Sequence, residues 1–174
     1  MIQTRFLIGA ALALTAVTGA LAQGAKPTLI GTYKNWTMWS YDGSYGAAQG
    51  KVCYIYSEPE KMQPTKLDHG RVSFSVAIVP AEQKSTEANF VAGYPLKEQS
   101  KVTVEIGDSQ FTMFTEGDSA WLVNKEDEPA LLEAMRGGTR MVVKATSGKG
   151  NNTSYDYSLA GVTAASDQMQ TDCQ

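Results

Sequence analysis

The sequence predicts a mainly β fold of the sandwich or barrel type, with one or two short helices. Short runs with a two-residue alternation or with β-branched and aromatic residues recur along the chain, and turn residues separate them. Only two stretches have the spacing and the boundary residues of a helix. Many short strands with few helices are typical of sandwiches and barrels.

The expected strands follow one another from residue 30 to residue 159. Arg71 to Pro80 (RVSFSVAIVP) alternates most clearly, so its apolar residues are expected on one buried face. Gly107-Asp108 should turn the chain between two alternating runs and form a β-hairpin. In chain order, the expected strands are Ile30 to Tyr41, Lys51 to Ser57, Arg71 to Pro80, Lys101 to Ile106, Gln110 to Thr115, Ala120 to Asn124, Thr139 to Ser147 and Thr153 to Leu159.

Two helices are expected in the C-terminal third of the chain. Ala130 to Arg136 follows Asp127-Glu128-Pro129, which is typical of a helix start, and Gly137-Gly138 ends it. Gly161 to Cys173 has small and apolar residues at spacings of three to four, which favours a second helix.

The N-terminus has the pattern of a cleavable signal peptide over residues 1–22. Arg5 supplies the positive charge, Phe6 to Val17 form a short apolar run, and Ala20-Leu21-Ala22 matches the cleavage pattern. A membrane anchor is the alternative, but the apolar run is shorter than the roughly 20 residues that a spanning helix needs. We expect a loose leader over residues 23–29, then a single domain over residues 30–174, in the periplasm, secreted or at the outer envelope.

Composition argues against several classes of partner. The chain carries 15 basic and 18 acidic residues, for a net charge of −3, and its basic residues are scattered. This pattern gives no footprint for nucleic acid. No second apolar segment approaches membrane-spanning length. The sequence therefore predicts no nucleic-acid partner and no transmembrane segment once the signal is removed.

The two cysteines, Cys53 and Cys173, are expected to form a structural disulfide. Two thiols in an exported chain are more often a disulfide than a reactive site. A redox pair is the alternative, but it usually has its thiols close in sequence, as in Cys-x-x-Cys.

Catalytic and metal-binding patterns are weak. His69 is the single histidine, and beside Asp68 it is a candidate base for a periplasmic enzyme, but no nucleophile motif accompanies it. We favour a histidine in a turn. Glu126 to Glu128 could bind calcium but lacks the alternating ligands of a calcium loop, so a helix start is favoured. Ser147 to Ser154 does not match a phosphate loop and reads as a polar hairpin loop. We expect no catalytic, metal or cofactor site.

Aromatic residues give the most suggestive functional pattern. Aromatic side chains near glycine and serine can form a recognition surface for a protein or glycan, but aromatic residues that alternate on a strand more often belong to the core, which is the interpretation we favour. Trp121, in an apolar strand, is expected in the core. The candidate interaction surface consists of Trp39, Tyr41, Tyr45, Lys149, Asn151 and Asn152.

Short fragments in a fixed order from Cys53 to Cys173 carry one further signal. They are Cys53-Tyr54-Ile55, Glu58-Pro59, Gly93-Tyr94-Pro95-Leu96, Phe111, Gly117-Asp118-Ser119-Ala120-Trp121, Ala134-Met135-Arg136-Gly137-Gly138, Met141-Val142-Val143-Lys144, Ser147-Gly148-Lys149-Gly150 and Asp156-Tyr157-Ser158-Leu159-Ala160-Gly161. Behind a signal peptide and the early Trp36, this order resembles the invasion-associated locus B family of exported bacterial proteins.

The resemblance implies an immunoglobulin-like β-sandwich in the periplasm or at the outer envelope, in a family named for a locus associated with entry into host cells. It implies no catalytic residues. One departure concerns the disulfide: family members often have a cysteine shortly after the first tryptophan, where this chain has Thr37-Met38-Trp39-Ser40. The resemblance therefore does not supply the Cys53–Cys173 pairing. A structural or stress-related envelope protein without a discrete ligand remains the alternative function.

Overall fold

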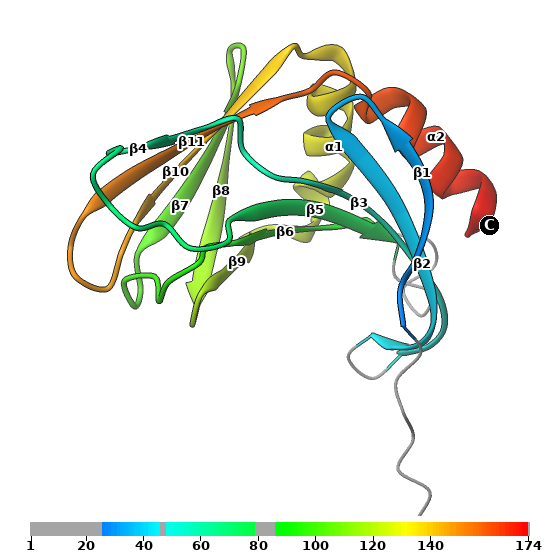
Figure 1. The fold of residues 1–174 in the computed structure, drawn as a ribbon, viewed down its shortest axis with the longest axis horizontal. Coiled ribbons are helices and arrows are strands. Elements are labelled where there is room, and N and C mark those ends of the chain that lie inside the picture. Colours follow the sequence, from blue (N-terminus) through cyan, green and yellow to red (C-terminus); the bar gives the residue numbers. More distant parts are fainter. Residues whose placement is uncertain (1–25, 46–47, 79–85, 174) are drawn as a thin grey trace, which may run out of the picture.

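A computed structural model describes residues 26–45, 48–78 and 86–173 of the chain (Figure 1). The predicted signal peptide, residues 23–25 of the predicted leader and the side chain of Tyr45 lie outside the described residues.

Within the described ranges, eleven strands form one antiparallel sheet in the order β1-β2-β3-β5-β6-β9-β8-β7-β10-β11-β4. Their bounds are β1 Thr28–Tyr33, β2 Trp36–Tyr45, β3 Ala48–Ser57, β4 Lys61–Gln63, β5 Ser73–Ile78, β6 Thr86–Val91, β7 Lys101–Ile106, β8 Ser109–Glu116, β9 Ser119–Leu122, β10 Arg140–Thr146 and β11 Asn152–Ser158.

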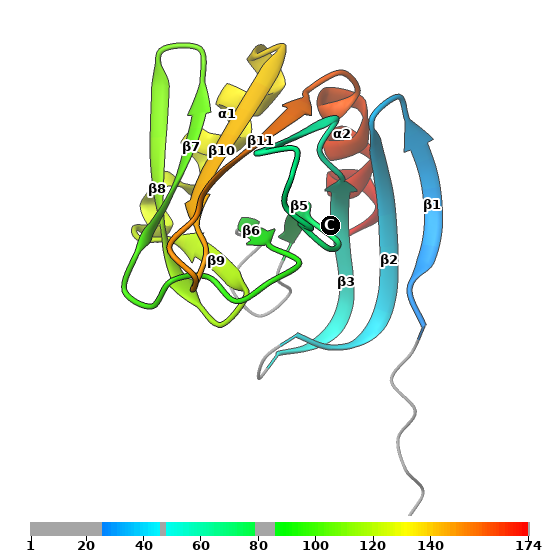
Figure 2. The same cartoon turned by 60° about the vertical axis from the view of Figure 1, so that its left-hand side comes forward.

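The sheet folds over on itself, so that its two halves face each other across the core. Figure 2 shows β1, β2 and β3 on one side and β7, β8 and β10 on the other. Phe74 of β5 lies 6.1 Å from Tyr157 of β11 between ring centroids, and Phe90 of β6 lies 5.4 Å from Tyr155. These strands are far apart in the sheet order, so the contacts join two layers. The mainly β, sandwich-like fold with two short helices is confirmed, with both layers formed by one continuous sheet.

Alternation along the strands places the core. In β5, Phe74, Val76 and Ile78 are buried, as the sequence predicts, and Ser73 and Ser75 are only partly buried. Burying such a set of side chains is the main source of stability in a fold of this size. The largest fully buried side chains are Trp36, Tyr155, Tyr157, Phe74, Phe90, Met38, Ile55, Met113, Leu131, Met135, Met141 and Met169.

Both expected helices are present. A short 3₁₀ turn, η1 (Lys125–Asp127), leads into α1 (Glu128–Gly137), with a proline in its first turn. The second helix, α2 (Val162–Asp172), packs against β1, β2 and β3. None of the helices in the described ranges is long and apolar enough to cross a membrane.

The expected strands differ from the structure in three respects. Ile30 to Tyr41 is two strands, because the chain turns at Lys34, which has a φ of 54°, and Asn35. The first strand, β1, begins at Thr28, inside the predicted leader. The short strand β4 and the strand β6 (TEANFV) were missed, since neither shows a clean alternation of apolar and polar residues.

Trp121 was predicted in the core, and this was wrong. Its side chain is only partly buried, and its ring stacks on Phe114 at 5.9 Å between centroids. The apolar residues that flank it, Ala120 and Leu122, are the buried ones. A two-residue period therefore places Trp121 on the outer face of β9.

Candidate functional site

The outer face of β2 and β3 carries a group of aromatic side chains. Trp39 and Tyr41 of β2 alternate with the buried Met38 and Ser40, so they point away from the core. Trp39 is directly opposite Tyr54 in the register of β2 with β3. We call Leu29, Trp39, Tyr41, Tyr54 and Tyr56 together the aromatic face.

The aromatic face extends from the edge strand inward. Leu29 of β1 is 47% exposed and lies opposite Trp39, so the apolar row crosses three strands. Tyr41 and Tyr54 pack edge to face, with ring centroids 6.4 Å apart. A shallow pocket of about 260 Å³ lies beside them, and Pro27, Trp39, Tyr54, Tyr56 and Arg71 line it.

A charged pair borders the aromatic face. Arg71 lies 6.0 Å from the ring centroid of Tyr56, and its Nε is 3.1 Å from Oε1 of Glu58. The Tyr56 hydroxyl donates to the same oxygen at 2.7 Å. This hydrogen bond, assisted by Arg71, lowers the pKa of Glu58. The pair is solvent-exposed, so it contributes little to stability. We call Arg71 and Glu58 the rim of the aromatic face.

His69 is buried in a hydrogen-bond chain and is more than a turn residue. Its Nε2 lies 2.9 Å from the carbonyl oxygen of Pro64, which can only accept, so Nε2 carries a proton. Its Nδ1 lies 3.0 Å from the Tyr155 hydroxyl. That hydroxyl also contacts the Tyr94 hydroxyl, which lies 2.7 Å from Oγ1 of Thr153. Both ring nitrogens therefore have structural partners.

Asp68 does not orient His69. The Oδ1 atom of Asp68 accepts from the backbone N–H of Gly70 at 3.0 Å, which is a local turn contact. The pair that sequence reasoning weighed as a catalytic base and its carboxylate is thus not formed in this structure.

A pocket of about 370 Å³ opens beside His69. The predicted loop residues Lys149 and Asn151 line it, together with Tyr94 and Thr153 of the hydrogen-bond chain. Asn152 lies instead on the neighbouring groove at the start of β11. All three predicted loop residues are exposed, as expected for a polar hairpin loop.

The predicted interaction surface is two separate places. Trp39 and Tyr41 lie on β2, near one end of the sheet order, whereas the loop of Lys149 to Asn152 joins β10 and β11 near the other end. Figure 1 shows these two regions on opposite sides of the molecule. We therefore correct the single predicted surface to the aromatic face and the separate loop.

Sequence reasoning missed Tyr54 and Tyr56 as members of this surface. The alternation in KVCYIYS places both on one face of β3, which is a detectable signal. Nothing in the sequence indicates that Tyr54 of β3 lies opposite Trp39 of β2. Tyr94 and Tyr155 were also missed, because the contacts that join them to His69 span 25 residues or more along the chain.

The acidic segment Glu126 to Glu128 lies at a helix start, as favoured, but it forms no side-chain cap. Asp127 accepts a long hydrogen bond of 3.3 Å from Asn124. Glu128 is buried, and its carboxylate accepts from the backbone N–H of Ala88. No three His, Cys, Asp or Glu side chains within the described ranges are grouped to hold a metal ion.

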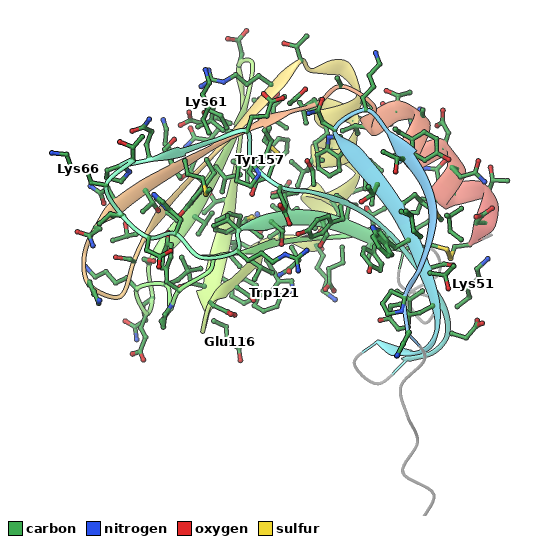
Figure 3. The ribbon with its side chains drawn as sticks, in the orientation of Figure 1. Lys51, Lys61, Lys66, Glu116, Trp121 and Tyr157 are labelled. Atoms are coloured by element: carbon green, nitrogen blue, oxygen red, sulfur yellow. A yellow bond between two sulfur atoms is a disulfide. The ribbon has the colours of Figure 1, made fainter. Side chains whose placement is uncertain are left out.

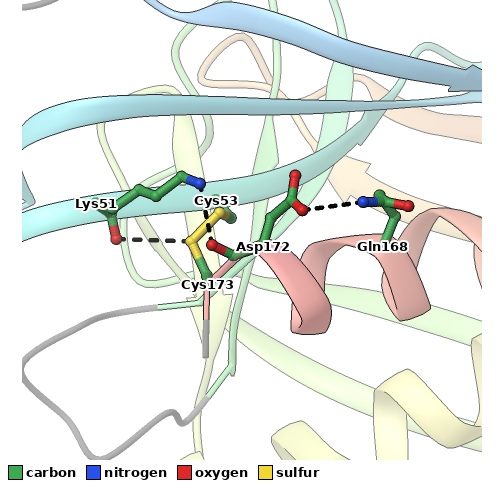
Figure 4. Close-up of a disulfide and its surroundings, with 5 residues drawn as sticks. All are labelled: Lys51, Cys53, Gln168, Asp172 and Cys173. Carbon is green, nitrogen blue, oxygen red and sulfur yellow. Dashed lines mark hydrogen bonds between the residues drawn. A yellow bond between two sulfur atoms is a disulfide. The ribbon is translucent and has the colours of Figure 1, made fainter.

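Cys53 and Cys173 form the expected disulfide, with their Cα atoms 6.0 Å apart (Figure 4). The bond joins β3 to the residue after α2, across 120 positions of sequence. The Lys51 ammonium donates to the Asp172 carbonyl at 3.0 Å beside it. The disulfide thus fixes the end of the C-terminal helix to the sheet.

Replacing Tyr157 by phenylalanine is expected to raise the free energy of unfolding by about 1 kcal/mol. The Tyr157 ring is fully buried against Phe74, and its hydroxyl has no hydrogen-bond partner among the described residues. A buried hydroxyl without a partner loses its hydrogen bonds to water and forms none in the protein, which destabilises the folded state. Urea denaturation of Tyr157→Phe and of the parent chain measures the difference.

Tyr155→Phe is the matched control, because the hydroxyl it removes contacts His69 and Tyr94. We expect this variant to be less stable by about 1–2 kcal/mol, since His69 loses a buried partner. A loss of similar size in both variants would mean that the Tyr157 hydroxyl is bonded in solution.

Comparison with known proteins identifies the family and a similar fold. The model of the family described as invasion associated locus B (IalB) protein matches residues 39–170. A comparison with curated proteins gives no match. The fold is similar to the crystal structure of invasion associated protein B from Bartonella henselae, with a TM-score of 0.59 and 14% sequence identity, over 83% of this chain and 97% of that chain. At this identity the likeness concerns the fold alone.

Proposed function

Because this chain belongs to the invasion associated locus B family, we propose that it is a non-enzymatic binding module of the bacterial envelope, and that its partner is another protein. The family and the disulfide are consistent with a location outside the cytoplasm, where disulfides persist. The aromatic face is the proposed contact surface.

The arrangement of the aromatic face supports this proposal. Tyrosine, tryptophan and arginine are the residues that most often dominate binding energy at protein interfaces. Here Trp39 and Tyr54 lie at the centre, and the charged pair of Arg71 and Glu58 lies at the rim. An apolar centre with a polar rim is the usual anatomy of a protein interface.

The edge strand favours a protein over a glycan. Strand β1 is at the end of the sheet order and exposes Leu29 and Ile30, at 47% and 40%. Exposed aliphatic side chains on a sheet edge suit contact with another chain, and they offer nothing to the hydroxyl groups of a sugar. Leu29 is continuous with the aromatic residues through its pairing with Trp39.

The surroundings of His69 support a role without catalysis. A general base must reach the proton that it removes from a substrate. The two ring nitrogens of His69 instead contact Pro64 and Tyr155, and Asp68 contacts Gly70. With these contacts, His69 acts as a buried side chain that stabilises the loop before β5.

Replacing Trp39 and Tyr54 together by alanine is expected to reduce partner capture at least tenfold, because truncating a central aromatic pair typically costs 2 kcal/mol or more of binding energy. Both side chains point outward, so the melting temperature should change little. Crosslinking of the exported protein in intact cells, followed by mass spectrometry, measures the capture. A host-cell lysate provides the second source of partners.

A matched control removes exposed apolar side chains elsewhere. Phe114 and Val123 are 45% and 50% exposed and lie outside the aromatic face and its rim, so Phe114→Ala/Val123→Ala should capture the partner normally. Equal loss in both double variants would overturn the assignment of the surface. Capture of glycan alone would replace the protein partner, and absence of any specific capture would favour a structural envelope role.

A further inference from the structure

A second pair of aromatic rings lies on the outer face of the sheet, away from the aromatic face. Phe114 of β8 and Trp121 of β9 are directly paired in register, and their rings stack at 5.9 Å with planes 29° apart. Phe114 is 45% exposed and Trp121 is partly exposed. Neither ring belongs to the buried core, so core packing does not explain why two aromatic side chains lie together on this surface.

Beside these rings is a pocket of about 270 Å³ with an acidic lining. Figure 3 shows Trp121 and Glu116 at the same end of the molecule. Glu87 of β6 and Glu128 of α1 add two more carboxyl groups, and Lys125 of η1 is the basic residue of the lining. Lys101, the cross-strand neighbour of Phe114, lines a different groove.

Glu128 is the unusual member of this lining. It is only 5% exposed, and both of its carboxylate oxygens share one donor, the N–H of Ala88, at 3.0 and 2.9 Å. The pairing of β6 with β9 begins at Asn89, so Glu128 occupies the place of a strand partner for Ala88. A carboxylate has about four acceptor positions, and one N–H leaves most of them unused.

Burial is costly for this carboxyl group. Burial raises the pKa of Glu128 to about 7, although the Ala88 N–H and the charge of Lys125 lower it, and the nearby charge of Glu87 adds to the rise. A positive charge in the pocket would offset both effects. The pocket therefore combines two aromatic faces with a buried carboxylate whose pKa stays raised even though the charge of Lys125 acts on it.

We propose that this pocket binds an organic ammonium ion, such as a quaternary ammonium group or an alkylammonium head. Cations of this kind are attracted to the faces of tryptophan and phenylalanine rings, and desolvated sites strengthen the attraction. The carboxylates of Glu116 and Glu128 supply the opposite charge.

An inorganic metal ion is a poorer fit for the same residues. A calcium or magnesium ion needs several oxygen ligands converging on one point. The carboxylates of the pocket do not form such a group within the described part of the chain. Aromatic rings contribute nothing to a metal's coordination, but they suit a large cation with a diffuse charge and apolar methyl groups.

The test is a titration with tetramethylammonium chloride at constant ionic strength, followed by the NMR signal of the Trp121 indole N–H. We expect saturable binding in the intact protein. Glu128→Gln and Phe114→Leu should each weaken it at least fivefold, because one removes a charge and the other removes a ring face. Tert-butanol, a neutral molecule of similar shape, should not saturate the site.

The pH dependence provides a second readout. Binding should strengthen by up to about tenfold between pH 6 and pH 8, because the pKa of Glu128 lies near 7 and its ionised form attracts the cation. Glu128→Gln should lose this dependence. The variant Trp39→Ala/Tyr54→Ala should bind tetramethylammonium normally, which separates this site from the proposed protein-binding surface.

Three results would overturn the proposal. They are equal binding of tert-butanol, full binding by Glu128→Gln, and displacement of tetramethylammonium by magnesium at matched ionic strength. Because Phe114 is exposed and glutamine keeps the acceptor for the Ala88 N–H, neither variant should disturb the fold, and thermal denaturation checks this.

Discussion

Replacing both cysteines by serine, in Cys53→Ser/Cys173→Ser, is expected to lower the free energy of unfolding by about 5 kcal/mol. The bond closes a loop over a sequence separation of 120, and a cross-link of that span removes much of the conformational entropy of the unfolded chain. Urea denaturation of the oxidised protein and of the variant gives the difference. A domain with typical stability would retain only a small margin after such a loss.

The location of the bond adds a structural reason for this large effect. Cys173 follows directly on α2, and this helix packs against β1, β2 and β3 through its buried residues Ala165 and Met169. Without the bond, the end of α2 is held by the Lys51–Asp172 contact, which is exposed and contributes little. The chain has only these two cysteines, so no second disulfide can compensate.

Reduced wild-type protein is the control for the serine variant. Both lack the cross-link, so both should unfold at much lower urea concentration than the oxidised protein. The variant should be the less stable of the two by about 1 kcal/mol, because its serine hydroxyl at position 53 is fully buried in the core. If the oxidised protein and the variant differed by less than about 1 kcal/mol, the unfolded chain would have to be compact already, and the loop-entropy account would fail here.

The sequence predicted the elements whose signals are local. The alternation of Arg71 to Pro80 correctly placed Phe74, Val76 and Ile78 in the core. The hairpin at Gly107 and the helix after Pro129 were also correct, because turn glycines and helix starts are read from adjacent residues.

The missed features depend on partners that are distant in sequence. Strand β6 was missed because its mixed residues become a strand only between β5 and β9. The burial of His69 depends on Tyr155, which is 86 positions away. The aromatic face was found only in part, because the pairing of Leu29 and Tyr54 with Trp39 is a property of the sheet.

Gly161 belongs to one of the fragments that carry the resemblance to the family, and its conformation depends on residues far away in the sequence. It precedes α2 with a φ of 102°, a conformation that side chains with a Cβ rarely adopt. The neighbouring Ala160 carbonyl accepts from the N–H of Asn35, in the turn between β1 and β2. The start of the last helix is therefore held against the first hairpin of the described chain.

Gly161→Ala is expected to lower the free energy of unfolding by about 4 kcal/mol, from backbone strain and overpacking together. A Cβ at this position would lie 1.8 Å from the carbonyl oxygen of Tyr33 and 2.7 Å from its carbonyl carbon. Both are backbone atoms, so relief requires the β1–β2 turn to move away from α2. Urea denaturation measures the loss, and hydrogen exchange of Asn35 should increase.

Gly107→Ala is a reference for a left-handed glycine without crowding. Gly107 also has a positive φ, of 56°, but an added Cβ would meet nothing within 4 Å. This variant should lose only about 1–2 kcal/mol, the cost of a left-handed conformation for alanine. Because Gly107 lies in the left-handed well and Gly161, with a φ of 102°, lies outside it, the excess loss at Gly161 combines added backbone strain with the crowding against Tyr33. Equal losses would mean that this junction yields easily, and that the packing of Ala165 and Met169 and the disulfide hold the C-terminal helix in place.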